Sequence, residues 1–295
     1  MKFNSPLVIK SFAKLNLYLR VLGRRKDNFH NLDTLFVRID LADTIILKGR
    51  KDSSIRIKCD SRHVPKDETN LCFRAAELLR QEFNLNSGLE IEIKKRIPVG
   101  AGLGGGSSNA ASTLVGLSKY WHLNLTKEKL AILAAKLGSD VAFFVHDVKF
   151  ALGSQRGDKI KPLNFLEKVK LRFILVYPGV KVSTPLIYKE FDLFISELTR
   201  RRPDAKIILP ELLKKGSHID AKYFFNDLEV ITTNLYPVVK KVKDSLLAVG
   251  LESVMMSGSG PAVFAICDSR TQAQDLSSKL RKEHKSWQIF LSSAI

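Results

Sequence analysis

The stretch PVGAGLGGGSSNAAS, residues 98–112, is the most informative part of this sequence. Five glycines and two serines fall within nine residues of it. An alternating strand pattern, LEIEIKKR at 89–96, precedes the stretch, and a helical pattern rich in Ala, Leu and Ser follows it over 107–120. Bare backbone N–H groups beside a helix N-terminus attract anions. A mobile turn alone would not require so many glycines at a helix start, so the stretch predicts a phosphate-binding loop.

The stretch lacks features that the two common types of phosphate-binding loop require. A Walker A loop requires a lysine after its last glycine, and no lysine follows Gly105 or Gly106. A dinucleotide fingerprint is matched formally by Gly100, Gly102 and Gly105. However, the preceding strand alternates, a proline interrupts the junction, and no acid stands near position 120 to hold a ribose. Neither common loop is therefore indicated.

Outward from the loop, the pattern predicts a strand-rich beginning and a mixed remainder. The expected strands lie at 7–49 (with a turn at Ala42-Asp43), 55–58, 89–96 and 171–177, with a glycine-serine turn leading into a last strand within 254–267. The expected helices are 70–83, 107–120 and 126–137, whereas 141–146 reads as either a buried strand or a short helix. We expect two domains, residues 1–160 and 161–295.

Composition excludes several classes of protein. Of 295 residues, 45% are hydrophobic and 26% charged, which excludes bulk disorder. No apolar run approaches the roughly 18 residues of a membrane span, and we expect neither a secretory signal nor a membrane partner, hence a cytoplasmic location. Three distant cysteines and the absence of HExxH argue against a disulfide framework and leave any metal ligand unknown. The net charge of +18 favours polyanionic partners.

The glycine stretch resembles the PxxxGLGSSAA-type motif of the GHMP kinases. The segment SFAKLNLYLRVLGRRKDNFHNLDTLF (11–36) resembles SPAKINLFLxVxGxRxDGYHxLxT, which opens one branch of that family, and LGSDVAFFV (137–145) resembles its LGADVPFF. Further matches follow in family order over nearly the whole chain: TNLCFRAA, PGVKVSTPLIYK, FFNDLE and SGSGPAVFAI.

The resemblance implies an α+β, two-domain fold, with an N-terminal ATP-binding β/α domain and a ferredoxin-like C-terminal domain. It implies transfer of the γ-phosphoryl group of ATP, with Mg²⁺, to the 2-hydroxyl of a cytidine diphospho-methylerythritol in non-mevalonate isoprenoid precursor synthesis. The expected partner is thus a small molecule rather than a membrane or a nucleic acid, and the expected state is a monomer or weak homodimer.

The resemblance also assigns roles to individual residues. Asp140 would be the catalytic base, and Lys14 would pair with it and offset negative charge. ATP would be bound by Pro98, Val99, Gly100, Ala101, Gly102, Leu103, Gly104, Gly105, Gly106, Ser107, Ser108, Asn70, Leu71 and Lys95, with the two serine hydroxyls available to phosphate or magnesium. The acceptor substrate would be bound by Asn16, Phe29, His30, Tyr188, Gly258, Ser259 and Gly260.

Departures from the family pattern and the charge leave alternatives open. Phe29 stands where the family has tyrosine, Ala142 where it has proline, and Gln155-Arg156-Gly157-Asp158 where it has GRGE. A kinase for another small alcohol is therefore an alternative, as is a catalytically inactive nucleic-acid-binding relative, although no RNP or helix-turn-helix signature is present. From the residues alone, the preferred interpretation of Asp140 is an ordinary helix cap, and that of Lys14 is a solvated strand lysine. The basic segment 196–220 has no functional interpretation.

Overall fold

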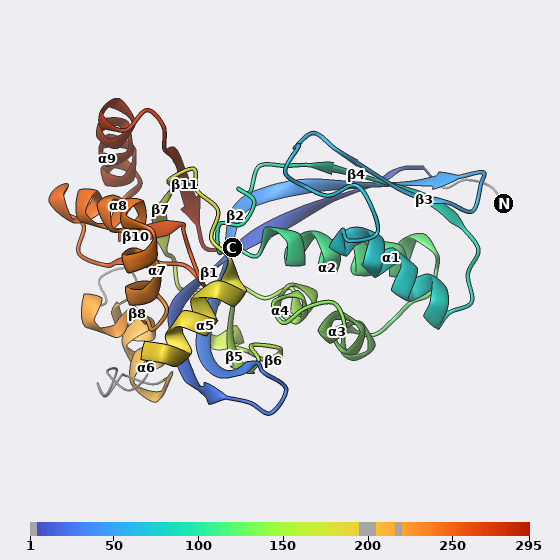
Figure 1. Cartoon of the computed structure of the whole chain (residues 1–295), viewed down its shortest axis with the longest axis horizontal. Helices are drawn as coiled ribbons and strands as arrows, with labels where there is room; N and C mark the ends of the chain where they lie inside the picture. The colour runs from blue at the N-terminus through green and yellow to red at the C-terminus, as the bar shows by residue number, and fades with distance from the viewer. Residues whose placement is uncertain (1–4, 195–204, 216–219) are drawn as a thin grey trace.

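The computed structural model describes residues 5–194, 205–215 and 220–295, which form two halves built on separate sheets (Figure 1). The strands of the larger sheet are β1 (Leu7–Arg24), β2 (His30–Arg50), β3 (Ile55–Cys59), β4 (Gly88–Lys94), β5 (Phe150–Gln155), β6 (Lys159–Pro162) and β8 (Phe225–Asn226). They lie in the order β3-β4-β2-β1-β8, and β5 and β6 extend the sheet from β2. The two longest strands of this sheet, β1 and β2, pair with each other antiparallel.

Four helices cover one face of this sheet (Figure 1). They are α1 (Leu71–Glu82), α2 (Gly105–Tyr120), α3 (Lys127–Ala135) and α4 (Val141–His146). The helix starts follow capping chemistry: the Asn70 side chain accepts from the Cys72 N–H, and the Thr126 hydroxyl accepts from the Lys129 N–H. Apolar side chains of α1–α4 pack with those of β2 and β4 into one buried cluster, which fixes α2 against the sheet.

The second half contains the strands β7 (Arg172–Tyr177), β9 (Val254–Met256), β10 (Val263–Cys267) and β11 (Gln288–Ser293). Its helices are α5 (Thr184–Phe194), α6 (Ala205–Lys215), α7 (Glu229–Leu235), α8 (Pro237–Ala248) and α9 (Arg270–Glu283), with short 3₁₀ turns η1 (Asn164–Leu166) and η4 (Ala221–Tyr223). The antiparallel order β11-β7-β10-β9, with helices in both crossovers, is the ferredoxin-like topology. The predicted α+β class and the ferredoxin-like second half are confirmed.

The two halves are joined by more than the connecting chain. The two-residue strand β8 belongs by sequence to the second half but pairs with β1, with Tyr18 opposite Phe225. Another buried cluster includes side chains from both sheets, among them Leu15 of β1 and Phe264 of β10. The division at 160/161 stays a prediction, because β6 extends to Pro162 and β8 returns to the first sheet.

The structure corrects one sequence expectation and resolves another. No turn occurs at Ala42-Asp43, because β2 continues through both residues. The register with β1 instead shifts there, since Phe12 faces Ala42 while Ala13 faces Ile39. The segment 141–146, left open between strand and helix, is the helix α4.

Two further expectations concern the membrane and the basic segment. Within the part of the chain that the structure describes, no helix has both the length and the apolar character needed to cross a bilayer. Of the basic segment 196–220, residues 205–215 form α6, whereas 195–204 and 216–219 lie outside the described residues.

Candidate active site

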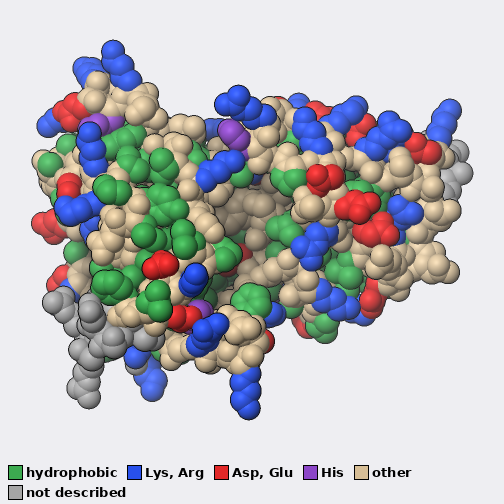
Figure 2. Space-filling view, in the orientation of Figure 1, with side chains coloured by type: hydrophobic (Ala, Val, Ile, Leu, Met, Phe, Trp, Pro, Cys, Tyr) green, Lys and Arg blue, Asp and Glu red, His purple; other side chains and the backbone are tan. Residues whose placement is uncertain are grey.

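A cavity of about 420 Å³ lies between the two halves. Figure 2 shows this face of the molecule hollowed where the halves meet. Its wall is formed by β1, the glycine loop with the first turn of α2, Asp140 before α4, the start of α5 and the 258–259 turn. Segments far apart in the sequence therefore meet at one site.

The glycine loop presents the N-terminus of α2 to this cavity. Gly104 precedes the helix in the left-handed conformation (φ +69°), and no side chain caps the helix there. The N–H groups of the first helical turn have no intrahelical acceptor. A side chain at Gly104 would also collide with its surroundings, since a Cβ there would lie 2.9 Å from Phe144 and 3.1 Å from Lys14. The arrangement leaves the α2 N–H groups open to an anion such as phosphate.

The turn at 257–260 supports the glycine loop from the other half of the molecule. The Ser257 hydroxyl donates to the Gly102 carbonyl at 3.1 Å, and the Ala262 N–H donates to the Ala101 carbonyl at 3.1 Å. The backbones approach so closely that a Cβ on Gly102 would lie 2.1 Å from the Ser257 carbonyl oxygen. The shape of the loop therefore depends on both halves.

Lys14 and Asp140 form an ion pair within the cavity, with Nζ and Oδ2 3.5 Å apart. The Lys14 ammonium is buried and also donates to Asn16 Oδ1 at 2.6 Å. The Asn16 amide in turn donates to the Thr34 hydroxyl at 2.8 Å, so the lysine is held in one orientation. The Asp140 side chain is 34% exposed and makes no helix-cap hydrogen bond, which leaves its carboxylate able to reach a second partner.

The residues predicted to border the adenine line the cavity, but two of their side chains have structural partners. The Asn70 amide donates to the Pro65 carbonyl at 2.6 Å while its oxygen caps α1. The Lys95 ammonium pairs with Asp43, which is completely buried. These contacts order the loop beside the cavity and the strand that enters the glycine stretch.

The residues predicted for the cytidine end are only partly brought together. Tyr188 lines the cavity and stacks on the His30 ring, with centroids 4.9 Å apart. Desolvation, with a smaller contribution from the nearby Asp140 charge, raises the pKa of the Tyr188 hydroxyl above its usual range. His30 is buried behind Tyr188, with Nε2 2.6 Å from a carboxylate oxygen of Asp192. Phe29 lies away from the cavity, 51% exposed, beneath the Arg156 guanidinium.

Placement against the cavity sorts the predicted site residues into two sets. Those that line it are Lys14, Asn16, Asn70, Leu71, Lys95, Pro98, Val99, Gly100, Ala101, Gly102, Leu103, Gly104, Gly105, Gly106, Ser107, Asp140, Tyr188, Gly258 and Ser259. Those that do not are Phe29, His30, Ser108 and Gly260. The Ser108 hydroxyl is buried against the Ser11 hydroxyl at 2.7 Å, and its contact with phosphate or magnesium stays a prediction.

Sequence reasoning missed several side chains at or behind the site. Thr184, in the matched segment PGVKVSTPLIYK, lines the cavity and shares a 2.6 Å hydrogen bond with Ser259. Thr34, in the matched segment 11–36, is the last member of the hydrogen-bond chain that runs from Lys14 through Asn16. The sequence predicts a turn at Asp43, and only its place within a longer strand pattern, just before the apolar residues Ile45–Leu47, could have suggested otherwise.

Comparison with known proteins agrees with this architecture. The family described as "GHMP kinases N terminal domain" matches residues 70–147, and "GHMP kinases C terminal" matches residues 208–286. The fold, the glycine loop and these matches define the chain as a GHMP kinase. Two proteins named 4-diphosphocytidyl-2-C-methyl-D-erythritol kinase, from Alkaliphilus metalliredigens (strain QYMF) and Acaryochloris marina (strain MBIC 11017), are 40% and 38% identical to it. The chain belongs to the 4-diphosphocytidyl-2-C-methyl-D-erythritol kinase family.

These similarities extend over nearly the whole molecule. The alignments with the two relatives cover 88% and 92% of this chain and 87% and 91% of theirs. A crystal structure of 4-(cytidine 5'-diphospho)-2C-methyl-D-erythritol kinase superposes with a TM-score of 0.78 at 31% identity, covering 97% of this chain and 98% of that one. A homoserine kinase from Cytophaga hutchinsonii shares the fold, with a TM-score of 0.70 at 18% identity, covering 98% of this chain and 95% of that one.

Thiol chemistry gives a first test of the burial around the site. Burial raises the pKa of Cys72, which lines the cavity wall, to about 12 and that of Cys267 to about 11, whereas Cys59 is partly exposed. Desolvation also raises the pKa of Cys59, but that thiol is less buried than the other two. The thiolate is the reactive form, so the most deeply buried thiols react most slowly. We expect iodoacetamide at pH 8 to modify Cys59 first, as read by mass spectrometry. In guanidinium all three should react, and native labelling of Cys72 as fast as Cys59 would contradict the structure.

Proposed function

We propose that this protein transfers the γ-phosphoryl group of ATP to the 2-hydroxyl of 4-diphosphocytidyl-2-C-methyl-D-erythritol, a step in isoprenoid precursor synthesis by the non-mevalonate route. The relatives' names supply the acceptor. The observation that carries the proposal is the Lys14–Asp140 pair, which faces the same cavity as the open N-terminus of α2. A phosphate group held by α2 and a hydroxyl beside Asp140 would both be within that cavity.

The chemistry requires little beyond position and charge. The acceptor oxygen forms a bond to the γ-phosphorus while the bond to the β–γ bridging oxygen breaks and ADP leaves. Asp140 takes the proton of the acceptor hydroxyl. The Lys14 ammonium and the N–H groups of α2 offset the negative charge that develops on the transferred group. Because Lys14 is held by Asn16 as well as by Asp140, its position does not depend on the protonation of the aspartate.

Mg²⁺ is part of the proposal. The residues present suit an ion that arrives bound to the nucleotide phosphates rather than one held entirely by protein side chains. Across residues 5–194, 205–215 and 220–295, no three acidic, histidine or cysteine side chains are grouped to hold a metal. Magnesium in kinases is usually held by the phosphates with one or two protein oxygens. The Ser107 hydroxyl is an oxygen donor on the cavity wall. The bound ion would neutralise phosphate charge.

The division of the cavity suggests how the acceptor lies. Among the residues that line the cavity, Tyr188, Thr184 and Ser259 belong to the second half of the chain, whereas Pro65 and Asn70 belong to the loop before α1. We assign the cytidine diphosphate end of the acceptor to the side formed by the second half and the adenine to the side formed by Pro65, Asn70 and neighbouring residues. Phe29 has no part in this assignment, because its ring lies outside the cavity.

The net charge of +18 fits two polyanionic substrates and also bears on assembly. Like-charged copies repel one another, so we propose a monomer or weak homodimer. We also propose a cytoplasmic location, where both substrates would be found. A catalytically inactive nucleic-acid-binding role is disfavoured, because the catalytic pair and the anion-binding loop are both intact.

A coupled ADP-release assay with a panel of alcohols tests the proposed function. We expect turnover with 4-diphosphocytidyl-2-C-methyl-D-erythritol and only background ADP release with homoserine, mevalonate, galactose or no acceptor. The cavity offers the cytidine end an aromatic face at Tyr188, which the small alcohols cannot use. Product analysis by ³¹P NMR should show a new phosphomonoester on the alcohol. Faster turnover of another alcohol would favour the alternative of a different GHMP kinase.

A further inference from the structure

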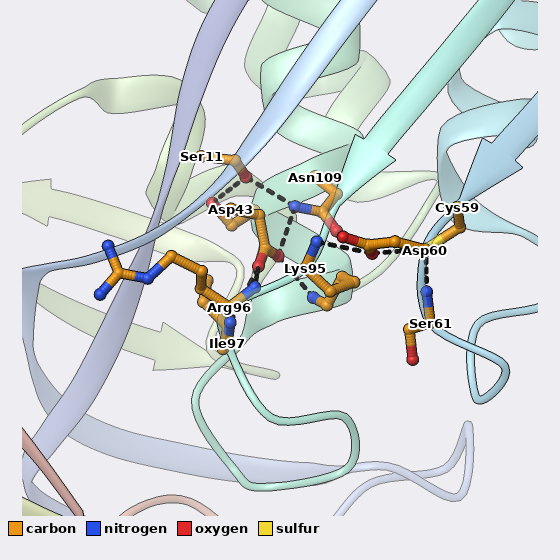
Figure 3. Close-up of polar contacts among 10 residues, drawn as sticks. Ser11, Asp43, Cys59, Asp60, Ser61, Lys95, Arg96, Ile97 and Asn109 are labelled. Carbon is orange, nitrogen blue, oxygen red and sulfur yellow. Dashed lines mark hydrogen bonds and ion pairs between the residues drawn. The ribbon is translucent and has the colours of Figure 1, made fainter.

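The chain leaves β4 and enters the glycine loop through three backbone N–H groups that have lost their sheet partners. Pairing of β4 with β2 ends at Lys94, and its pairing with β3 ends at Ile93. The next three N–H groups, those of residues 95–97, need other acceptors, because buried backbone donors are rarely left unpaired. All three find carboxylates: Asp60 accepts from residue 95 at 3.0 Å, and Asp43 accepts from residues 96 and 97 at 2.7 and 2.9 Å (Figure 3).

The second oxygen of Asp43 reaches to the far end of the loop. It pairs with the Lys95 ammonium and accepts from the Asn109 amide at 2.9 Å (Figure 3). The Asn109 amide also donates to the Ser11 hydroxyl at 2.9 Å, which ties the group to β1. Asn109 lies in the second turn of α2, so one carboxylate holds both the strand before the loop and the helix after it.

The place of the Lys95 ammonium explains why a buried acid is needed. A Cβ on Gly105 would lie 3.2 Å from Lys95 Nζ, so the ammonium lies against the first turn of α2. A cation is unfavourable beside the positive end of a helix dipole unless an anion compensates it. Asp43 provides that anion, and because it is completely buried it cannot itself contact a ligand in the cavity.

We propose that Asp43 is a positioning residue for the nucleotide. It acts through two groups that line the cavity, holding the Lys95 ammonium beside α2 and fixing both ends of the glycine loop at the separation that a phosphate chain requires. The inference rests on the proposed function only in taking ATP as the nucleotide. It is independent of the acceptor, whose proposed contacts at Tyr188 and Thr184 share no hydrogen bond with the Asp43 group.

The substitution Asp43→Asn tests this role with little change of shape. The amide oxygen can still accept from the N–H groups of residues 96 and 97, but its NH₂ group then faces two donors, Lys95 and Asn109. We expect the dissociation constant of a nonhydrolysable ATP analogue, measured by calorimetry without acceptor, to rise at least tenfold. The KM for ATP should rise in parallel, whereas the KM for the acceptor should change by less than threefold.

A matched control separates this effect from general damage to the strand. Asp40 lies three residues earlier on β2 and accepts from Ser292 and Ser293 of β11, without a contact to the loop. Asp40→Asn should leave ATP-analogue affinity within twofold of the wild type. Melting temperatures of both variants report folding. Unchanged ATP affinity in folded Asp43→Asn, or an equal rise in both KM values, would overturn the proposal.

A double-mutant cycle tests whether Asp43 acts through Lys95. Lys95→Met should weaken the ATP analogue, and the double variant Asp43→Asn/Lys95→Met should bind no more weakly than the weaker single variant. If the dissociation constant of the double variant instead rises by the product of the two single-variant increases, the two residues act independently and the proposal is overturned. If Asp43→Asn does not fold, Asn109→Leu provides a second test, because it removes one hydrogen-bond donor to the Asp43 carboxylate. This variant should raise the dissociation constant of the analogue twofold to fourfold. An unchanged dissociation constant would contradict the proposed role. The binding assay contains no acceptor. A wrong assignment of the acceptor substrate would therefore not affect this test of Asp43.

Discussion

Replacing Asp140 with asparagine should reduce kcat by about 1,000-fold, the typical contribution of a positioned general base. Asparagine keeps the size of the side chain but cannot take the proton of the acceptor hydroxyl. The ATP-analogue affinity should stay within threefold of the wild type, because the loop and α2 do not use this carboxylate. Steady-state ADP release and calorimetry give the two measurements.

The control for this result lies at the other end of the same short helix. Asp147 follows α4, is largely exposed and pairs with Arg38, away from the cavity. Asp147→Asn should retain activity within twofold. A second check uses Lys14→Met: if Lys14 and Asp140 act as one unit, the double variant should be no slower than the slower single variant. Asp140→Asn with more than a tenth of wild-type kcat would exclude the aspartate as the base.

The parts of the fold that were predictable carry strong periodicity or turn chemistry. The alternation at 89–96 predicted β4, and the glycine stretch predicted a strand–loop–helix unit, because both patterns are local and repeated. The segment 141–146, five apolar residues and His146, could not be decided, since a buried strand and a buried helix turn have the same composition. The strand β8 has two residues, too few for any pattern, and its partner β1 lies some 200 positions earlier.

The site was predictable only where a motif carried it. The glycine loop could be interpreted from the residues, but Lys14 and Asp140 depended on family resemblance, because nothing in their sequence surroundings places them together. Asp43 was misread for a physical reason: a polar residue after an apolar run usually marks a turn, whereas here it remains in the strand and is satisfied by donors from β4 and α2. The place of the Phe29 ring outside the cavity was not predictable, because an aromatic side chain at a hairpin tip can face either way.

Replacing Gly102 with alanine should have the second large effect, because two separate costs apply at that position. Its φ of +77° is unfavourable for alanine by roughly 1–2 kcal/mol. The added Cβ would also lie 2.1 Å from the Ser257 carbonyl oxygen, so either the glycine loop or the 257–260 turn must move. We expect urea unfolding to show a loss of about 2–5 kcal/mol, and phosphoryl transfer to fall at least 100-fold in the protein that still folds, because displacement of the loop displaces the α2 N–H groups.

Comparison with Gly100→Ala isolates the second cost at Gly102, the collision with the Ser257 carbonyl oxygen. Gly100 lies in the same loop with nearly the same backbone conformation, φ +69°, but a Cβ there meets only the Lys181 side chain, at 3.6 Å. The backbone strain is thus matched, and only the collision between the two halves differs. Gly100→Ala should lose about 1–2 kcal/mol and keep its ATP-analogue affinity within threefold. Equal losses of activity in the two variants would mean that backbone strain alone accounts for Gly102, and that contact between the loop and the 257–260 turn does not set the nucleotide geometry.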